Sequence, residues 1–141
     1  KFIGKNGTIN LDNVPVLRIS EAILNRAEAQ ATAGSAVLNL AGALSDLKAI
    51  KARRYTDYTG SAQETADNAM TQAQLLEEIL RQRRIEFAFE GHRFFDLKRL
   101  GRDLVKAPHY NNVAFTDTRI LPALPQGDID GNPNLKQNAG Y

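Results

Sequence analysis

The chain contains no cysteine, and this absence excludes disulfide bonds, thiolate metal sites and a cysteine nucleophile. Its two histidines, His92 and His109, do not form the His-Glu-x-x-His pattern of a zinc-protease helix. No apolar run approaches the ~18 residues that would cross a bilayer. The first residues also lack the charged end and the apolar core of a signal peptide. The sequence therefore predicts a globular chain without thiol chemistry and without a membrane span.

A strong excess of either charge is also missing. The chain has 18 Lys and Arg residues against 16 Asp and Glu residues, a net charge of +2, and the two signs are interleaved. Nucleic-acid binding needs a concentrated basic surface, so the arginines and lysines of residues 81–102 do not predict it. With 43% hydrophobic residues, the chain can bury one core. We expect a single domain over residues 1–141.

Two stretches near the start have the periodicity of helices. From Pro15 onwards, apolar residues recur at helical spacing until Gly34. A second stretch begins at Ser35, which can cap a helix, and reaches the basic run around Arg53. Because the linker between them is short, we expect an antiparallel helical hairpin in which small alanines let the two backbones approach.

The second half of the sequence predicts one long helix followed by irregular structure. Residues 55–70 are polar and show no apolar period, so they indicate a long loop. The capping box Thr71-x-x-Gln74 opens a helix that reaches about Glu90, and a further short helix should end at Gly101. Most of the prolines come after that point and indicate an extended tail. The predicted fold class is all-α, with a helical hairpin, a long helix and a long irregular carboxy-terminal tail.

The segment EFAFEGHRFFDLKRL, residues 86–100, combines many charged and aromatic side chains. Glu86 continues the apolar helix face that Leu75 and Ile79 define, so we expect it to be buried. A buried charge needs a partner, because without one it costs several kcal/mol. The first helix of the hairpin carries a polar stripe beside its apolar face, which could supply the partners. We therefore predict a structural charge network between these helices, made up of Arg18, Glu21, Glu28, Arg83, Glu86, Glu90, His92, Arg93 and Asp96.

Some of these side chains also allow other interpretations. Glu86, Glu90 and His92 could act as an acid and a base in an enzyme, yet enough arginines lie nearby to keep the carboxylates ionised and paired. Asp128 and Asp130 resemble the start of a calcium loop, but the glycine and the glutamate that an EF-hand requires are missing, so an Asx turn fits better. We predict no catalytic residue, no metal and no cofactor.

Two tyrosines are the candidates for ligand contact within this chain. Tyr55 and Tyr58 lie in the polar segment beside Arg53 and Arg54, where their rings could stack on a sugar or a peptide. Tyrosines at the edge of a helical hairpin more often pack against it, so both interpretations stay open.

Three motifs, in the expected order, resemble those of the SusD/RagB family. Residues 79–102, ILRQRRIEFAFEGHRFFDLKRLGR, resemble its signature helix, and residues 15–31, PVLRISEAILNRAEAQA, resemble its Leu-Arg-x-x-Glu helix. Residues 124–141, LPQGDIDGNPNLKQNAGY, resemble its carboxy-terminal run. The chain departs from the pattern at positions such as Ala139, where the family often has proline, and such departures concern local loop shape.

This resemblance implies the carboxy-terminal part of a surface-exposed outer-membrane lipoprotein of the Bacteroidetes type, with tetratricopeptide-like helix pairs. Such proteins bind a nutrient glycan, or in some members a peptide, without catalysis, and deliver it to a SusC-like TonB-dependent transporter. The lipid anchor and most ligand contacts are then expected in a part of the parent chain outside this sequence. The implied partners are the transporter, the glycan or peptide, and the remainder of the parent chain.

A second interpretation is a helical-repeat module that binds a partner protein through the groove of the hairpin. The stretch from Ile85 to Phe95 is apolar on all sides of its predicted helix. Other parts of the protein must therefore pack against both sides of that helix. Only two other long helices are predicted, so we expect the isolated chain to fold poorly.

Overall fold

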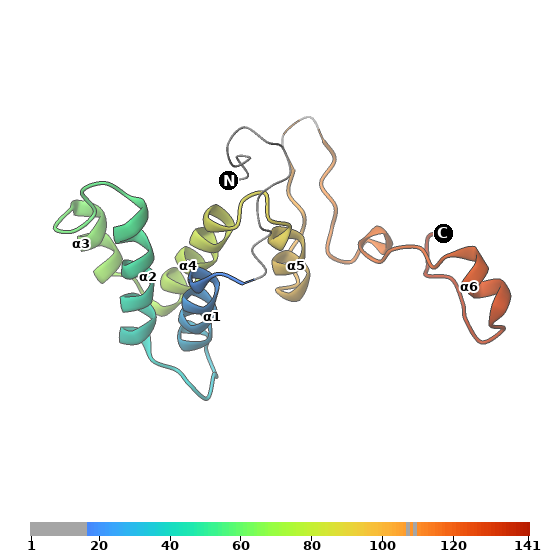
Figure 1. Ribbon diagram of the computed structural model, residues 1–141, viewed down its shortest axis with the longest axis horizontal. Coiled ribbons are helices and arrows are strands. Elements are labelled where there is room, and N and C mark those ends of the chain that lie inside the picture. The colour runs from blue at the N-terminus through green and yellow to red at the C-terminus, as the bar shows by residue number, and fades with distance from the viewer. Residues whose placement is uncertain (1–16, 107, 109) are drawn as a thin grey trace, which may run out of the picture. The chain divides into compact units, whose positions relative to one another are not determined.

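The computed structural model describes residues 17–106, 108 and 110–141. Its helices, drawn in Figure 1, are α1 (Ile19–Ala31), α2 (Leu40–Arg54), α3 (Ala62–Asn68), α4 (Gln72–Glu86), α5 (His92–Arg99), the 3-10 helix η2 (Thr118–Ile120) and α6 (Gln126–Gly131). Leu104 and Val113 form an isolated antiparallel bridge. The prediction of an all-α fold is confirmed.

The chain divides into two compact units, Lys1–Glu86 and Phe87–Tyr141. The first unit holds α1 to α4, and the second unit holds α5, η2 and α6. The prediction of a single domain over residues 1–141 requires that the two units form one domain together, and it stays a prediction.

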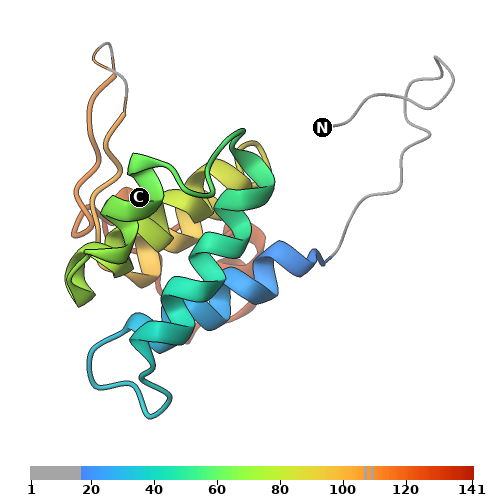
Figure 2. The same cartoon turned by 90° about the vertical axis from the view of Figure 1, so that its left-hand side faces the viewer.

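Helices α1 and α2 form the predicted antiparallel hairpin and lie side by side (Figure 2), and α1 also packs against α4. Leu24, Ala27 and Ala31 of α1 are buried, as their spacing predicts. Ala43 and Leu47 of α2 are buried as well. Small side chains at this interface let the two backbones come close, which makes the hairpin the core of the first unit.

The ends of α1 follow from its flanking residues. Arg18 has an extended backbone and occupies the N-cap position. The predicted start at Pro15 lies outside the described residues. Thr32 caps the other end, and Gly34, the predicted stop, has a φ of 76° in the left-handed region that glycine adopts readily.

Helix α2 begins later than predicted, at Leu40. Its N-cap is Asn39 and not Ser35, because the Asn39 side chain accepts a hydrogen bond from Gly42 N at 3.0 Å. The backbone N–H of Asn39 donates to Gln30 O at 2.9 Å, which ties the start of α2 to the end of α1. Val37, which follows the predicted cap Ser35, is exposed in the connection between the two helices. The contact with α1 therefore sets the start of the helix.

The predicted long loop over residues 55–70 is wrong in part, because it contains α3. Ser61 caps this helix by accepting a hydrogen bond from Glu64 N at 3.1 Å, and Glu64 accepts one from Gly60 N at 2.7 Å. Only Asp67 of α3 is buried. A short polar helix with one buried side chain has no periodic apolar residues, so the sequence pattern does not indicate it.

Helix α4 has the predicted start and an earlier end. Gln74 Oε1 accepts from Thr71 N at 2.9 Å, and Thr71 Oγ1 accepts from Gln74 N at 3.4 Å, so the capping box is confirmed. The helix ends at Glu86 and does not continue to Glu90. Phe89 has a φ of 66°, a left-handed conformation that a right-handed helix cannot contain.

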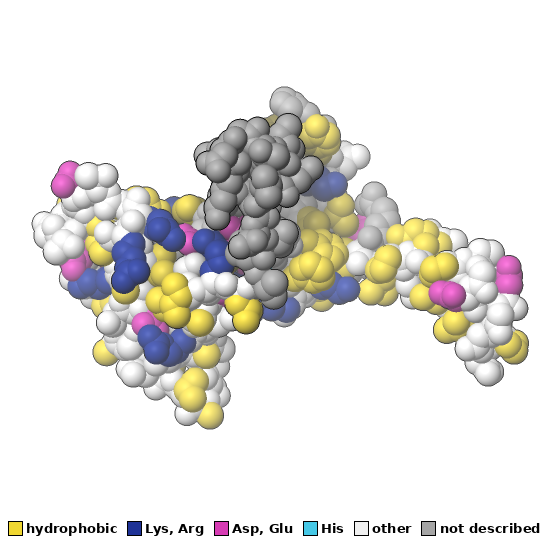
Figure 3. Space-filling model, in the orientation of Figure 1, with side chains coloured by type: hydrophobic (Ala, Val, Ile, Leu, Met, Phe, Trp, Pro, Cys, Tyr) yellow, Lys and Arg dark blue, Asp and Glu magenta, His cyan; other side chains and the backbone are white. Residues whose placement is uncertain are grey.

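The second unit begins with the turn before α5. The predicted short helix is confirmed as α5, and Gly101, with a φ of 63°, follows its C-cap. Hydrophobic side chains gather over α5 on the face that Figure 3 shows. Phe89 is 98% exposed and Phe95 is 67% exposed, so the enclosure expected for Ile85 to Phe95 does not hold for these side chains in the described structure.

Side chains bound to the backbone hold the carboxy-terminal tail. Gln137 donates to Leu124 O at 2.9 Å and accepts from Leu124 N at 2.8 Å. Asn138 donates to Pro122 O at 2.6 Å, and the Tyr141 hydroxyl donates to Leu121 O at 3.0 Å. The tail is turn-rich as predicted, but it also contains the unpredicted helix α6, none of whose residues is buried.

Candidate functional site

Among the described residues of the first unit, the most deeply buried charges lie around Lys51 of α2. Lys51 is 1% exposed, and its Nζ lies 2.8 Å from Asp67 Oδ2 and 2.5 Å from Glu78 Oε1. Asp67 of α3, 2% exposed, also accepts a hydrogen bond from the Tyr58 hydroxyl at 2.6 Å. One lysine therefore joins α2 to both α3 and α4. This group gave no signal in the sequence, because each member stands alone in its own segment.

Glu78 is held in its charged form. Burial by itself would raise the pKa of Glu78, but hydrogen bonds from Arg81, Lys51 and Gln82 outweigh burial and lower the pKa to about 2. Arg81 supplies two of these bonds, with Nε 2.6 Å from Glu78 Oε2 and Nη2 2.8 Å from Oε1. A carboxylate with this pKa is ionised at neutral pH and is poorly suited to donate a proton as a general acid.

The two candidate tyrosines take part in the same group. Tyr58 is 3% exposed, and burial followed by its bond to Asp67 raises the pKa of its hydroxyl. Tyr55 is half-buried, and Gln82 Nε2 donates to its hydroxyl at 3.1 Å. The burial of Tyr58 contradicts the idea that its ring stacks on a ligand at the surface, because the ring packs inside the fold. Tyr55 keeps part of its ring exposed and stays a candidate.

A second group of charges lies around Glu86 at the end of α4. Arg54 of α2 binds this carboxylate through Nε at 2.8 Å and Nη2 at 2.6 Å. Arg18 binds it as well, with Nη1 3.2 Å from Oε1, and also donates to Glu86 O at 2.9 Å. The hydrogen bonds from Arg54 lower the pKa of Glu86 to about 2, against the opposing effect of burial and with help from Ser20. Sequence reasoning named Arg18 but missed Arg54.

Arg83 connects α4 to the polar stripe of α1. It donates to Asn25 Oδ1, and its Nε lies 3.8 Å from Glu28 Oε2. Glu21, another predicted member of the charge network, lies in the first turn of α1 and is half-buried. The structure thus brings together part of the predicted network at the interface of α1 and α4.

The remaining predicted members belong to the second unit. They are Glu90, His92, Arg93 and Asp96, and each of them has interaction partners. Asp96 is buried and accepts from Arg99 Nη2 at 2.8 Å, while the His92 ring lies 4.7 Å from the Phe87 ring, measured between centroids. Glu86 and Glu90 do not lie on one continuous helix, as the predicted helix reaching Glu90 would require, because α4 ends at Glu86.

The described part of the chain offers neither a metal site nor a membrane span. Within it, no three or more His, Asp or Glu side chains come together in a way that could hold a metal ion. No helix there has the length and apolar composition that a bilayer span requires.

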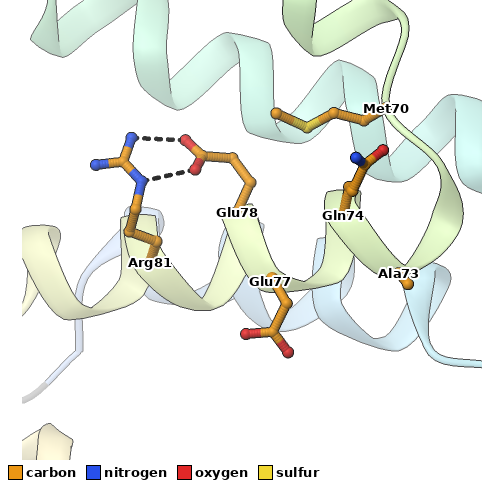
Figure 4. A pocket seen from close by; sticks show the side chains of 6 residues that line it. All are labelled: Met70, Ala73, Gln74, Glu77, Glu78 and Arg81. Atoms are coloured by element: carbon orange, nitrogen blue, oxygen red, sulfur yellow. Dashed lines mark hydrogen bonds and ion pairs between the residues drawn. The ribbon is translucent and has the colours of Figure 1, made fainter.

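An open pocket of about 540 Å³ lies along one face of α4 (Figure 4). Its lining residues are Met70, Ala73, Gln74, Glu77, Glu78 and Arg81. Met70 precedes the helix, and the others recur at the three- and four-residue spacing of one helix face. Figure 4 shows the paired Glu78 and Arg81 side chains on the same side of α4 as Met70 and Gln74.

Taken together, the fold and the charge groups define a helical scaffold. The buried carboxylates Asp67 and Glu86 and the half-buried carboxylate Glu78 are each matched with lysine or arginine. This arrangement fixes helices relative to one another and keeps Glu78 and Glu86 ionised, as expected for a framework rather than for an acid–base pair.

The comparison with protein families identifies the scaffold. The profile of the SusD family matches residues 1–141, the whole of the sequence. The chain therefore belongs to the SusD family, in agreement with the resemblance carried by its three motifs.

One solved structure extends this result. The chain is similar to a crystal structure from Bacteroides vulgatus ATCC 8482, with 30% sequence identity and a TM-score of 0.69. That protein is named as a candidate sugar-binding protein. The similarity covers 94% of this chain and 31% of the other chain, so this chain spans about a third of that protein. No curated protein matches the sequence.

Proposed function

We propose that this chain is the scaffold portion of a nutrient-binding protein at the bacterial outer-membrane surface. In this proposal the parent protein binds a glycan, or in some settings a peptide, without catalysis and delivers it to a SusC-like TonB-dependent transporter. A lipid carried by another part of the parent protein anchors it to the membrane. The observation that supports the proposal is the family match over residues 1–141, together with a solved relative named for sugar binding.

The buried charges support the scaffold role. Lys51, Arg54 and Arg18 bind carboxylates that belong to other helices, so removing one of them leaves an enclosed carboxylate with less positive charge beside it. Tyr58 is buried and unsuited to contact a ligand at the surface. These residues hold the helices in place, and we place the principal ligand contacts outside this chain.

The experiment is affinity electrophoresis of the intact parent protein through gels that contain single purified polysaccharides. We expect at least one neutral polysaccharide to retard the protein, and we expect recovered glycan to have unchanged length by chromatography. Retardation of a Tyr55→Ala variant, compared with that of the unmodified protein, tests whether the half-buried ring of Tyr55 contacts the glycan. Shortened glycan would overturn the non-catalytic role. Binding to no glycan and no peptide would overturn the nutrient-binding role.

Delivery to a transporter is tested separately in cells. Deletion of the gene should slow growth on the glycan that the protein binds, and growth on the free monosaccharide should be unchanged. Co-purification of the tagged protein with an outer-membrane transporter of the TonB-dependent class would support the partnership. If the tagged protein purifies without any outer-membrane transporter, the delivery step is wrong even where glycan binding holds.

A further inference from the structure

The segment that contains α3, residues 56–70, lies next to α2 (Figure 1) and is attached to the first unit by few contacts. Of its side chains, only those of Tyr58 and Asp67 are buried. The backbone hydrogen bonds that the described structure shows for this segment, such as the one from Ser61 N to Tyr58 O at 3.1 Å, stay inside it. Moving the segment away therefore breaks no backbone hydrogen bond to another described residue.

Two lysines of α2 form ion pairs with this segment. Lys51 Nζ lies 2.8 Å from Asp67 Oδ2 and 6.0 Å from the centre of the Tyr58 ring. Lys48, which is partly exposed, pairs with Glu64 at 2.6 Å between Nζ and Oε1. The Tyr58 hydroxyl donates to Asp67, so the two buried side chains of the segment meet at Lys51. Among the described residues outside the segment, Lys51 is thus the only buried side chain that forms an ion pair with it.

Lys51 keeps an ionic partner when Asp67 moves away. Its Nζ also lies 2.5 Å from Glu78 Oε1, and Glu78 belongs to α4 and not to the segment. Arg81 and Gln82 donate hydrogen bonds that hold Glu78 in place. Departure of the segment carries Asp67 into water, where a carboxylate is well solvated, and leaves Lys51 paired with Glu78. The movement therefore leaves no buried charge alone, and it costs less free energy than unfolding of the helical hairpin.

The helices on both sides of the segment are secured without it. Tyr55 caps α2, and its hydroxyl accepts a hydrogen bond from Gln82 Nε2 at 3.1 Å. At the other side, the capping box of Thr71 begins α4. Gln72 Nε2 donates to Ala31 O at 3.0 Å and ties this start to α1. Helices α1, α2 and α4 can therefore stay folded while the residues between Tyr55 and Thr71 move.

The same segment supplies one wall of the pocket on α4. Met70 is the last residue of the segment and lines the pocket (Figure 4). Its N–H donates to Asp67 O at 3.3 Å, so Met70 moves together with Asp67. Release of Asp67 from Lys51 therefore also draws Met70 away from the pocket.

We propose that residues 56–70 form a flap that opens and closes as a unit while α1, α2 and α4 remain folded. We call the contact of Asp67 and Tyr58 with Lys51 the clasp of this flap. In the closed state Met70 limits the pocket on α4. In the open state the pocket is wider, and water reaches Lys51. The flap is a conformational device of the scaffold, and it does not depend on which ligand the parent protein binds.

The first test is native-state hydrogen exchange of the intact protein with single-residue resolution. The hydrogen-bonded amides of residues 60–70 should share one opening free energy and exchange at least about tenfold faster than the buried amides of α1, α2 and α4. If they exchange only when α2 and α4 also open, the flap does not exist. Rates that fall steadily from the ends of α3 to its middle would indicate fraying of a docked helix, and they would also overturn the proposal.

The second test weakens the clasp. Asp67→Asn keeps an oxygen that accepts hydrogen bonds but removes the negative charge. Asp57 is exposed in the same segment and has a φ of 57°, a conformation that asparagine adopts readily, so Asp57→Asn is the matched control. Exchange of residues 60–70 should become roughly tenfold faster in Asp67→Asn, because a hydrogen bond to a charged group stabilises more than one to a neutral group. It should stay unchanged in Asp57→Asn.

The other helices and the pocket complete this test. Exchange in α1, α2 and α4 should be the same in Asp67→Asn as in the unmodified protein, because Lys51 keeps Glu78. Faster exchange in all four helices would show that the segment unfolds only together with the unit, and equal rates for the two variants would show that the clasp does not hold the flap. The methyl NMR shift of Met70 should move toward that of a solvated methionine in Asp67→Asn alone. An unmoved Met70 signal would contradict the link to the pocket.

Discussion

The two units of the chain are stabilised in different ways. In the first unit, long helices pack face to face, and buried ion pairs centred on Lys51 and Glu86 join helices that are distant in the sequence. In the second unit, large side chains such as Phe89 and Phe95 are exposed, and side chains such as Gln137 bind the nearby backbone. Stability in the first unit therefore depends on packed helices and their ion pairs, and in the carboxy-terminal tail of the second unit on hydrogen bonds from side chains to the backbone.

The largest expected effect is the loss of Lys51. Lys51→Met leaves Asp67 and Glu78 buried with less positive charge beside them, and we expect a loss of roughly 3–5 kcal/mol in unfolding free energy. Urea denaturation of the intact protein, monitored through spectroscopic signals of the first unit, measures this loss of unfolding free energy. Lys48→Met removes a partly exposed pair with Glu64 and should cost about 1 kcal/mol or less. Equal losses for the two variants would contradict a buried charge group.

A smaller effect should appear as the pH falls. The pKa of Glu78 and of Glu86 is about 2, below the unfolded value of 4.5, so both carboxylates stabilise the folded state above about pH 4.5. This contribution is lost progressively as the pH falls toward 2. Melting temperatures between pH 5 and pH 2 should decrease less steeply for Glu86→Gln than for the unmodified protein. Parallel curves would show that Glu86 makes no such contribution.

The smallest expected effect concerns the second unit alone. Gly140 has a φ of 97°, and a Cβ added there would overlap Thr118, so Gly140→Ala should loosen the tail by about 1–3 kcal/mol. Hydrogen exchange should become faster for amides of residues 118–141 and stay unchanged in α1, α2 and α4. At Gly127 a Cβ would meet no atom within 4 Å, so Gly127→Ala is the matched control. Faster exchange in the first unit would show that the two units do not unfold separately.

Much of the first unit could be predicted from the sequence. The buried face of α1, with Leu24 and Ala27, follows from helical spacing, and the Thr71–Gln74 capping box follows from hydrogen-bond chemistry within one turn. Helix α3 could not be predicted, because its only inward side chain, Asp67, is polar. The end of α4 at Glu86 was also missed, since a left-handed residue that is not glycine leaves no mark in the sequence pattern.

The candidate site was predictable to a lesser degree. The pairing of Glu86 with Arg18 follows from two polar stripes on neighbouring helices, but Arg54 lies on the exposed end of α2 and is a more extensive partner. The pocket on α4 had no sequence signal, because Met70 and Gln74 are common residues in ordinary helical positions.

The sequence by itself determined the helical class, the hairpin and the family, because these depend on local periodicity, capping residues and motif order. Only the tertiary structure decided which charges meet. Lys51 and Glu78 are 27 positions apart, and Arg54 and Glu86 are separated by 32. A charged side chain can pair with any opposite charge that lies close enough. The packing of α1, α2 and α4 determines which opposite charges are close, because it brings particular helix ends together.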